Sequence, residues 1–139
     1  MDAATHGYQW QFASDRTLDW ALANGFFGEF WTAPATAANT IGAALATFSV
    51  YADIKFNYLG HYANPSTAFE AGSDITASLG GFLLFRGTST WALGFPPNSA
   101  YDASFYTGAP GDMYLNINSA ANSFYLISSY RHPNSCSTY

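Results

Sequence analysis

Charged side chains are scarce in this chain. Four lysines and arginines and nine aspartates and glutamates make up 9% of its 139 residues, against roughly a quarter in an ordinary soluble domain. Their balance gives a net charge of −5, which argues against nucleic acid or an anionic membrane surface as a partner. The polar surface must therefore be built largely from serine, threonine, asparagine, glycine and tyrosine.

Cysteine is nearly absent, and long hydrophobic runs are absent. The single Cys136 cannot form a disulfide within the chain, which excludes a disulfide-stapled scaffold. No apolar run reaches the roughly 18 residues that a membrane-spanning helix needs. The first residues, Met1 to His6, have neither a basic region nor an apolar core, so no cleavable signal peptide is visible.

Aromatic residues, by contrast, are abundant at 19% of the chain. A chain of this length can bury about two-thirds of its unfolded surface and supports one core. We therefore predict a single domain over residues 1–139, with an irregular tail at residues 130–139. Phe26, Phe27, Phe30 and Trp31 follow neither a helical nor a strand period, and we expect them to cover one end of the core.

Alternating apolar residues predict several strands, and one segment predicts a helix. The strands are expected at 17–22, 53–59, 74–79, 91–95 and 113–117. Thr32 and Pro34 suit a helix start, and Ile41, Leu45 and Phe48 belong to an apolar stripe that continues to Tyr51 or Ala52. We predict an α+β fold with a twisted mixed sheet of four to five strands. The 33–52 helix packs on one face, and the opposite face lacks a covering helix.

Two further features of the helix and its neighbours follow from glycine and proline. Gly42 weakens a helix by roughly 1 kcal/mol relative to alanine, which indicates that close contact requires a small residue there. Residues 60–72 are expected to form a loop with Asn64 and Pro65 as its turn signal, and 82–85 is too short to classify.

The run from Thr90 to Gly94 has the pattern of a strand at the margin of a sheet. Trp91, Leu93 and Phe95 alternate with small residues. Pro96 and Pro97 end the run, and proline is confined to edge strands because it donates no hydrogen bond to a ladder. The loop of about 14 residues that follows is long for a compact domain, and such loops are usually functional or disordered.

A search for catalytic patterns finds few. His6, His61 and His132 are isolated from one another, so no pair has the spacing that directs two imidazoles toward zinc. Cys136 and the two glutamates, Glu29 and Glu70, stand in no recognisable catalytic pattern. Asp53, Asp74 and Asp112 each begin a predicted strand, where a carboxylate caps a turn more often than it binds a metal; calcium remains the alternative.

Several short motifs together resemble the N-terminal part of a serralysin-type metzincin, a family of secreted bacterial zinc peptidases. Trp10 precedes the strand at 17–22, and the motifs that follow in order are Tyr51–Phe56, Gly72–Ile75, Thr90–Ala92 and Gly111–Asn116. In the family, such motifs correspond to the first long helix with its following strand, a second strand, the substrate-binding edge strand and the strand after it. The order and spacing of the motifs over about 125 residues carry the resemblance.

The resemblance implies a zinc-dependent endopeptidase, with a peptide substrate bound along Thr90, Trp91, Ala92, Leu93 and Gly94. The family's next helix carries the zinc-binding HExxHxxGxxH motif. This sequence has Ser119–Tyr130 at that place instead. The resemblance implies zinc as the cofactor of complete members of the family, whereas we expect no cofactor and no peptidase activity in this chain. We expect the sequence to be a truncated or frame-shifted reading of a longer gene. An extracellular location is implied as well.

A different class of protein also suits the composition. Low charge and many tyrosines, asparagines and serines are suited to contacts between subunits. A non-enzymatic extracellular or virion structural protein is therefore the alternative hypothesis, and neither hypothesis fixes the oligomeric state.

Overall fold

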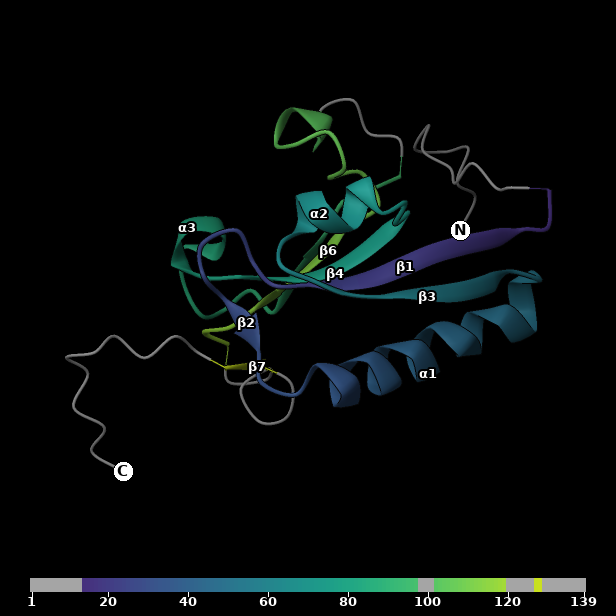
Figure 1. Cartoon of the computed structure of the whole chain (residues 1–139). Helices are drawn as coiled ribbons and strands as arrows, with labels where there is room; N and C mark the ends of the chain where they lie inside the picture. Colours follow the sequence, from purple (N-terminus) through teal and green to yellow (C-terminus); the bar gives the residue numbers. More distant parts are fainter. Residues whose placement is uncertain (1–13, 98–101, 120–126, 129–139) are drawn as a thin grey trace.

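The computed structural model of the chain describes residues 14–97, 102–119 and 127–128. Its centre is a five-stranded sheet in the order β3-β1-β4-β6-β5 (Figure 1). Four strands are parallel, and β5 runs antiparallel to β6 at one edge. In sheet order the strands are β3 (Lys55–Tyr62), β1 (Thr17–Ala23), β4 (Ile75–Gly80), β6 (Met113–Asn116) and β5 (Ala92–Gly94). The predicted α+β fold with a mixed sheet and one long helix is confirmed.

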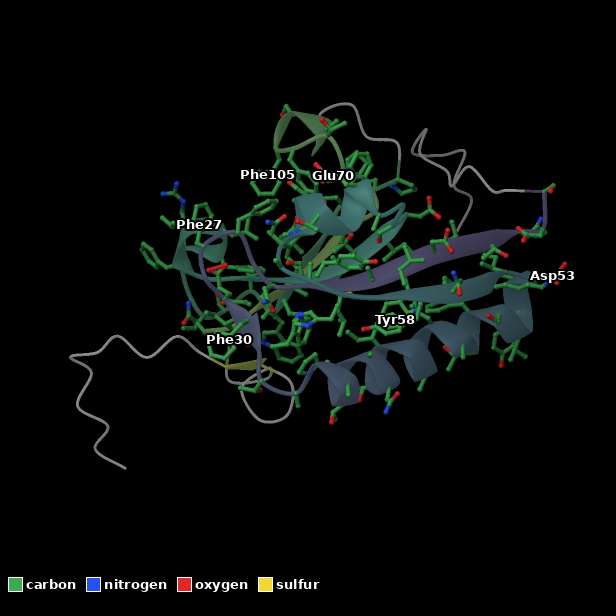
Figure 2. The ribbon with its side chains drawn as sticks, viewed as in Figure 1. Phe27, Phe30, Asp53, Tyr58, Glu70 and Phe105 are labelled. Atoms are coloured by element: carbon green, nitrogen blue, oxygen red, sulfur yellow. The ribbon has the colours of Figure 1, made fainter. Side chains whose placement is uncertain are left out.

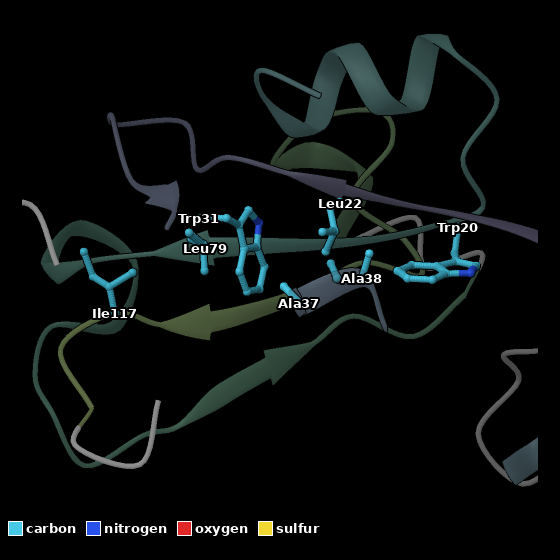
Figure 3. Close-up of a cluster of buried hydrophobic side chains, with 8 residues drawn as sticks. Trp20, Leu22, Trp31, Ala37, Ala38, Leu79 and Ile117 are labelled. Atoms are coloured by element: carbon cyan, nitrogen blue, oxygen red, sulfur yellow. The ribbon is translucent and has the colours of Figure 1, made fainter. Parts of the chain in front are cut away.

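Strand β1 is buried on both faces of the sheet. Trp20 and Leu22 belong to the larger core cluster, together with Ala37 and Ala38 of the long helix, and Figure 3 shows these side chains gathered on one side of the strands. Ala21 and Ala23 are fully buried in a second, smaller cluster on the opposite face. Because neighbouring strand residues point to opposite faces, two layers of helix have to cover this sheet.

The long helix α1 (Pro34–Ala52) forms the first of these layers. It begins at proline, whose fixed φ suits the first helical position, and ends at Asp53 in the left-handed conformation with φ 49°. Arg16 secures this end: its guanidinium donates hydrogen bonds to the carbonyl oxygens of Asp53 (3.0 Å) and Ala52 (3.1 Å). A cation at a helix C-terminus also interacts favourably with the helix dipole.

The predicted apolar stripe of α1 is only partly correct. Ile41 and Leu45 pack against the core, but Phe48 and Tyr51 are 60% and 90% exposed. A groove of about 680 Å³ lies between α1 and the strands. Its helix side is formed by small residues at helical spacing, namely Ala38, Gly42, Ala46 and Ser49. The large rings of Trp20, Phe56 and Tyr58 line the strand side of this groove.

A second helix, α2 (Pro65–Glu70), packs on the opposite face of the sheet (Figure 1). Its Ala68 is fully buried against Ala21 and Ala23. The expectations of a loop at 60–72 and of an uncovered face are therefore wrong. Asn64 and Pro65 are a helix start here, because the Asn64 side chain accepts a hydrogen bond from the Thr67 amide at 2.9 Å, with proline in the first turn.

Short elements complete the described structure. Helix α3 (Phe82–Phe85) follows β4 directly, and β2 (Phe30–Trp31) pairs antiparallel with β7 (Ile127–Ser128). A turn of 3-10 helix, η2 (Asp102–Ser104), precedes β6. Of the aromatic residues expected to cover one end of the core, Trp31 is buried and its indole N–H donates a hydrogen bond to the Ala23 carbonyl, whereas Phe27 and Phe30 are 64% and 43% exposed.

Some sequence expectations concern residues outside the described part of the chain. They include the aromatic lead-in at Trp10, the isolated His6 and His132, Cys136 and the tail at 130–139. None of the described helices is long and apolar enough to cross a membrane.

The Gly42→Ala variant should be more stable than the wild type by about 0.5–1 kcal/mol, because alanine is the better helix former. A Cβ at this position would lie 3.4 Å from the Trp20 ring, which is ordinary van der Waals contact rather than a clash. Urea denaturation measures the difference. A loss of stability would mean that the helix and the Trp20 ring already touch as closely as they can.

Candidate functional site

The five residues of the predicted substrate edge lie together at the edge of the sheet. Thr90 and Trp91 lead into β5, which consists of Ala92, Leu93 and Gly94. Strand β5 has β6 on one side, and within the part of the chain that the structure describes no other strand lies on its outer side. Trp91 is 65% exposed, so an aromatic ring stands at the entrance of the strand.

The hydrogen-bond ladder fixes which backbone groups of β5 face outward. The Trp91 carbonyl accepts from the Asn116 amide at 2.8 Å, and the Phe95 amide donates to the Asp112 carbonyl at 2.9 Å. Residues of an antiparallel strand alternate between facing the partner strand and facing away. Leu93, opposite Tyr114, therefore directs its N–H and C=O toward β6, while Ala92 and Gly94 direct theirs away from the sheet.

Asn116 holds the N-terminal end of β5 in place. Its side chain is fully buried, and its Nδ2 donates to the carbonyl oxygens of Gly87 and Thr90, both at 2.8 Å. Its Oδ1 accepts from the Asn118 amide at 2.9 Å. One buried amide thus fixes both the approach to β5 and the exit from β6, a role that the sequence pattern did not reveal.

Asp112 is the corresponding buried residue at the other end of β6. Only 2% of it is exposed, and its Oδ1 accepts from the Thr76 amide of β4 at 3.1 Å. Its Oδ2 accepts from the hydroxyl groups of Tyr106 and Tyr114. Burial raises the pKa of Asp112 to about 7, although these hydrogen bonds act in the opposite direction. Burial also raises the pKa of both tyrosines, whose proximity to the carboxylate adds to the effect.

The other candidate ligands do not converge. His61 Nε2 lies 2.9 Å from Asn24 Oδ1, and burial lowers the pKa of the imidazole. The Asp74 carboxylate accepts a hydrogen bond from the Asp19 amide of β1 at 2.9 Å, so it joins two distant segments and does not cap the turn that the sequence suggested. Within residues 14–97, 102–119 and 127–128, no three histidine, cysteine, aspartate or glutamate side chains gather in a way that could hold a metal ion.

Comparisons of the chain with protein-family models, curated proteins and solved structures find no match. The resemblance to serralysin-type peptidases therefore rests on the sequence motifs alone, and the geometry of β5 is the basis for any functional proposal.

Replacing Asp112 with asparagine should change how stability depends on pH. The carboxyl group of Asp112 has a higher pKa in the folded chain, about 7, than its ordinary value of 3.8. Its contribution to stability is therefore complete below about pH 4 and is lost as the pH rises through 7. Asparagine can keep the hydrogen bond from Thr76 without acquiring a charge. We expect Asp112→Asn to remove a pH-dependent loss on the order of a few kcal/mol.

The measurement is chemical denaturation of both proteins from pH 4 to pH 8. Asp53→Asn is the matched control, because it makes the same change in charge at an exposed residue in a left-handed conformation that asparagine tolerates. Parallel pH profiles for the wild type and Asp112→Asn would contradict the assignment.

Proposed function

We propose that β5 binds an extended peptide by strand addition, as part of a serralysin-like zinc-peptidase domain. The observation that supports this function is the outward direction of the Ala92 and Gly94 backbone groups at an edge of the sheet. Such groups can pair with the main chain of a bound peptide and supply affinity that depends little on its sequence. Peptide or protein substrates are the corresponding partners, and secretion belongs to the same proposal.

The strand sets a limit on the length of the pairing. Pro96 and Pro97 have no N–H to offer, and the Gly111 amide donates to the Phe95 carbonyl at 3.0 Å. The pairing surface therefore ends at Gly94 and extends toward Trp91, whose exposed ring can cover an apolar side chain of the peptide. Two or three peptide residues at this edge would be recognised by their backbone.

Binding and hydrolysis are separate parts of this proposal. In the family that the motifs resemble, a zinc ion activates the attacking water, and the histidines that would hold it are absent from this sequence. The residues of β5 would contribute the orientation of the substrate. Peptide bound along β5 would be held straight, with its main chain fixed relative to the sheet.

A structural or assembly role is the second candidate, and exposed apolar side chains on α1 favour it. Phe48, Val50 and Tyr51 are 60%, 79% and 90% exposed at the C-terminal part of the helix, where a monomer gains nothing from them. An assembly protein would form a defined large oligomer in sedimentation velocity. The peptide-binding proposal requires no such oligomer.

Proline substitutions at adjacent positions test the peptide-binding edge. Ala92→Pro removes an outward N–H, so peptide affinity should fall at least about tenfold while the free energy of unfolding changes by less than about 1 kcal/mol. Leu93→Pro removes an N–H that faces β6 and should cost on the order of 2 kcal/mol of stability. A short labelled peptide selected on an array with the wild-type protein serves as the ligand for fluorescence anisotropy.

The pair of variants separates binding from folding. Unchanged peptide affinity in a folded Ala92→Pro protein would reject β5 as the binding edge. Equal destabilisation by the two prolines would show that residue 92, too, is bonded within the sheet.

A further inference from the structure

A small cavity lies at the carboxyl end of β4, away from the outer side of β5. It has a volume of about 180 Å³ and is walled by the rings of Phe26, Phe27, Phe105 and Tyr114, by leucines of β4 and α3, and by Glu29. Figure 2 shows Phe27 beside α3 and Phe105 near the turn of 3-10 helix that precedes β6. The volume equals roughly six water molecules and is below the 300 Å³ or more of most small-molecule pockets. It suits one side chain or headgroup.

Glu29 supplies the carboxyl group of this cavity, and only 5% of the residue is exposed. Its Oε1 accepts a long hydrogen bond, 3.4 Å, from the Phe27 amide. A side chain at position 25 would collide with this oxygen, so Gly25 leaves the carboxyl group its space. Burial raises the pKa of Glu29, and no lysine, arginine or histidine of the described residues forms an ion pair with it.

The remaining walls determine which cation would fit. A primary ammonium group has three N–H donors, but the cavity offers it one carboxylate among apolar walls. The Tyr114 hydroxyl is already hydrogen-bonded to Asp112. A quaternary methylammonium group has no donor to satisfy, and its diffuse charge is attracted both by aromatic ring faces and by a carboxylate.

The aromatic walls of the cavity are in contact with one another. Phe26 and Phe105 meet edge to face with centroids 5.6 Å apart, and Phe105 and Tyr114 do so at 6.1 Å. Phe27 and Phe105 are 64% and 46% exposed, which leaves an entrance at the rim. The net charge of −5 also favours the approach of a cation.

We propose that this cavity binds a quaternary methylammonium group, held by the Glu29 carboxylate and by the rings of Phe26, Phe27, Phe105 and Tyr114. The group is the headgroup of choline and its derivatives or the side chain of trimethylated lysine. The site is independent of β5, so peptide binding at the sheet edge and methylammonium binding here can succeed or fail separately.

Titration of choline into the full chain, followed by the NMR chemical shifts of the Phe27 and Gly80 amides, tests the site. The neutral isostere 3,3-dimethylbutan-1-ol has the same shape without the charge, and we expect it to bind at least about tenfold more weakly. Equal affinity for the two compounds, or no shift with choline, would overturn the proposal. Phosphocholine and trimethyl-lysine amide, compared in the same way, distinguish a lipid-type headgroup from a modified side chain as the source.

The chain provides a matched pair of variants, because it has two glutamates. Glu29→Gln should weaken choline binding about tenfold or more, whereas Glu70→Gln, the same change at an exposed residue of α2, should leave it unchanged. Phe105→Leu keeps an apolar side chain but removes a ring, and should weaken binding about threefold to tenfold. Equal effects of Glu29→Gln and Glu70→Gln on choline affinity would overturn the site. If Glu29→Gln fails to fold, unchanged choline affinity in Phe105→Leu would overturn it instead.

Discussion

The pairing of β5 with β6 is the interaction on which the proposed peptide edge depends. Strand β6 has a buried polar residue at each end, Asp112 and Asn116. Asn116 bonds to the carbonyl groups that lead into β5, and Asp112 bonds to β4 and to the tyrosines. A buried polar group without its partner costs about 1–3 kcal/mol, so the bonds of Asn116 restrict β5 to one register.

A fixed register has a direct functional consequence. A one-residue slip would exchange the inward and outward backbone groups of β5. Ala92 and Gly94 offer their groups to a peptide only because Leu93 lies opposite Tyr114. Tyr114 of β6 also forms one wall of the cavity beside Glu29. Both proposed sites therefore depend on β6, but one would bind a peptide backbone and the other a methylammonium group.

The strands and the long helix could be predicted from the sequence, because period-two alternation and the proline at the helix start are local signals. Helix α2 was missed because six residues are too few for a helical period, and Asn64 with Pro65 is as typical of a turn as of a helix start. The direction of the α1 side chains was misjudged because small residues of α1 face Trp20, Phe56 and Tyr58 across a groove, and the large side chains near the end of α1 point elsewhere. Glu29 and Asn116 give no local signal, since their burial results from contacts with distant segments.

Amide hydrogen exchange resolved by residue tests the peptide edge most directly. In the free protein, the amides of Leu93 and Phe95 should be protected, while those of Ala92 and Gly94 exchange rapidly. Saturating peptide should slow the exchange of Ala92 and Gly94 by at least about tenfold, because their N–H groups become bonded to the added strand. Protection that appears instead along β3, the opposite edge of the sheet, or rapid exchange at Ala92 and Gly94 in the saturated complex, would contradict the account.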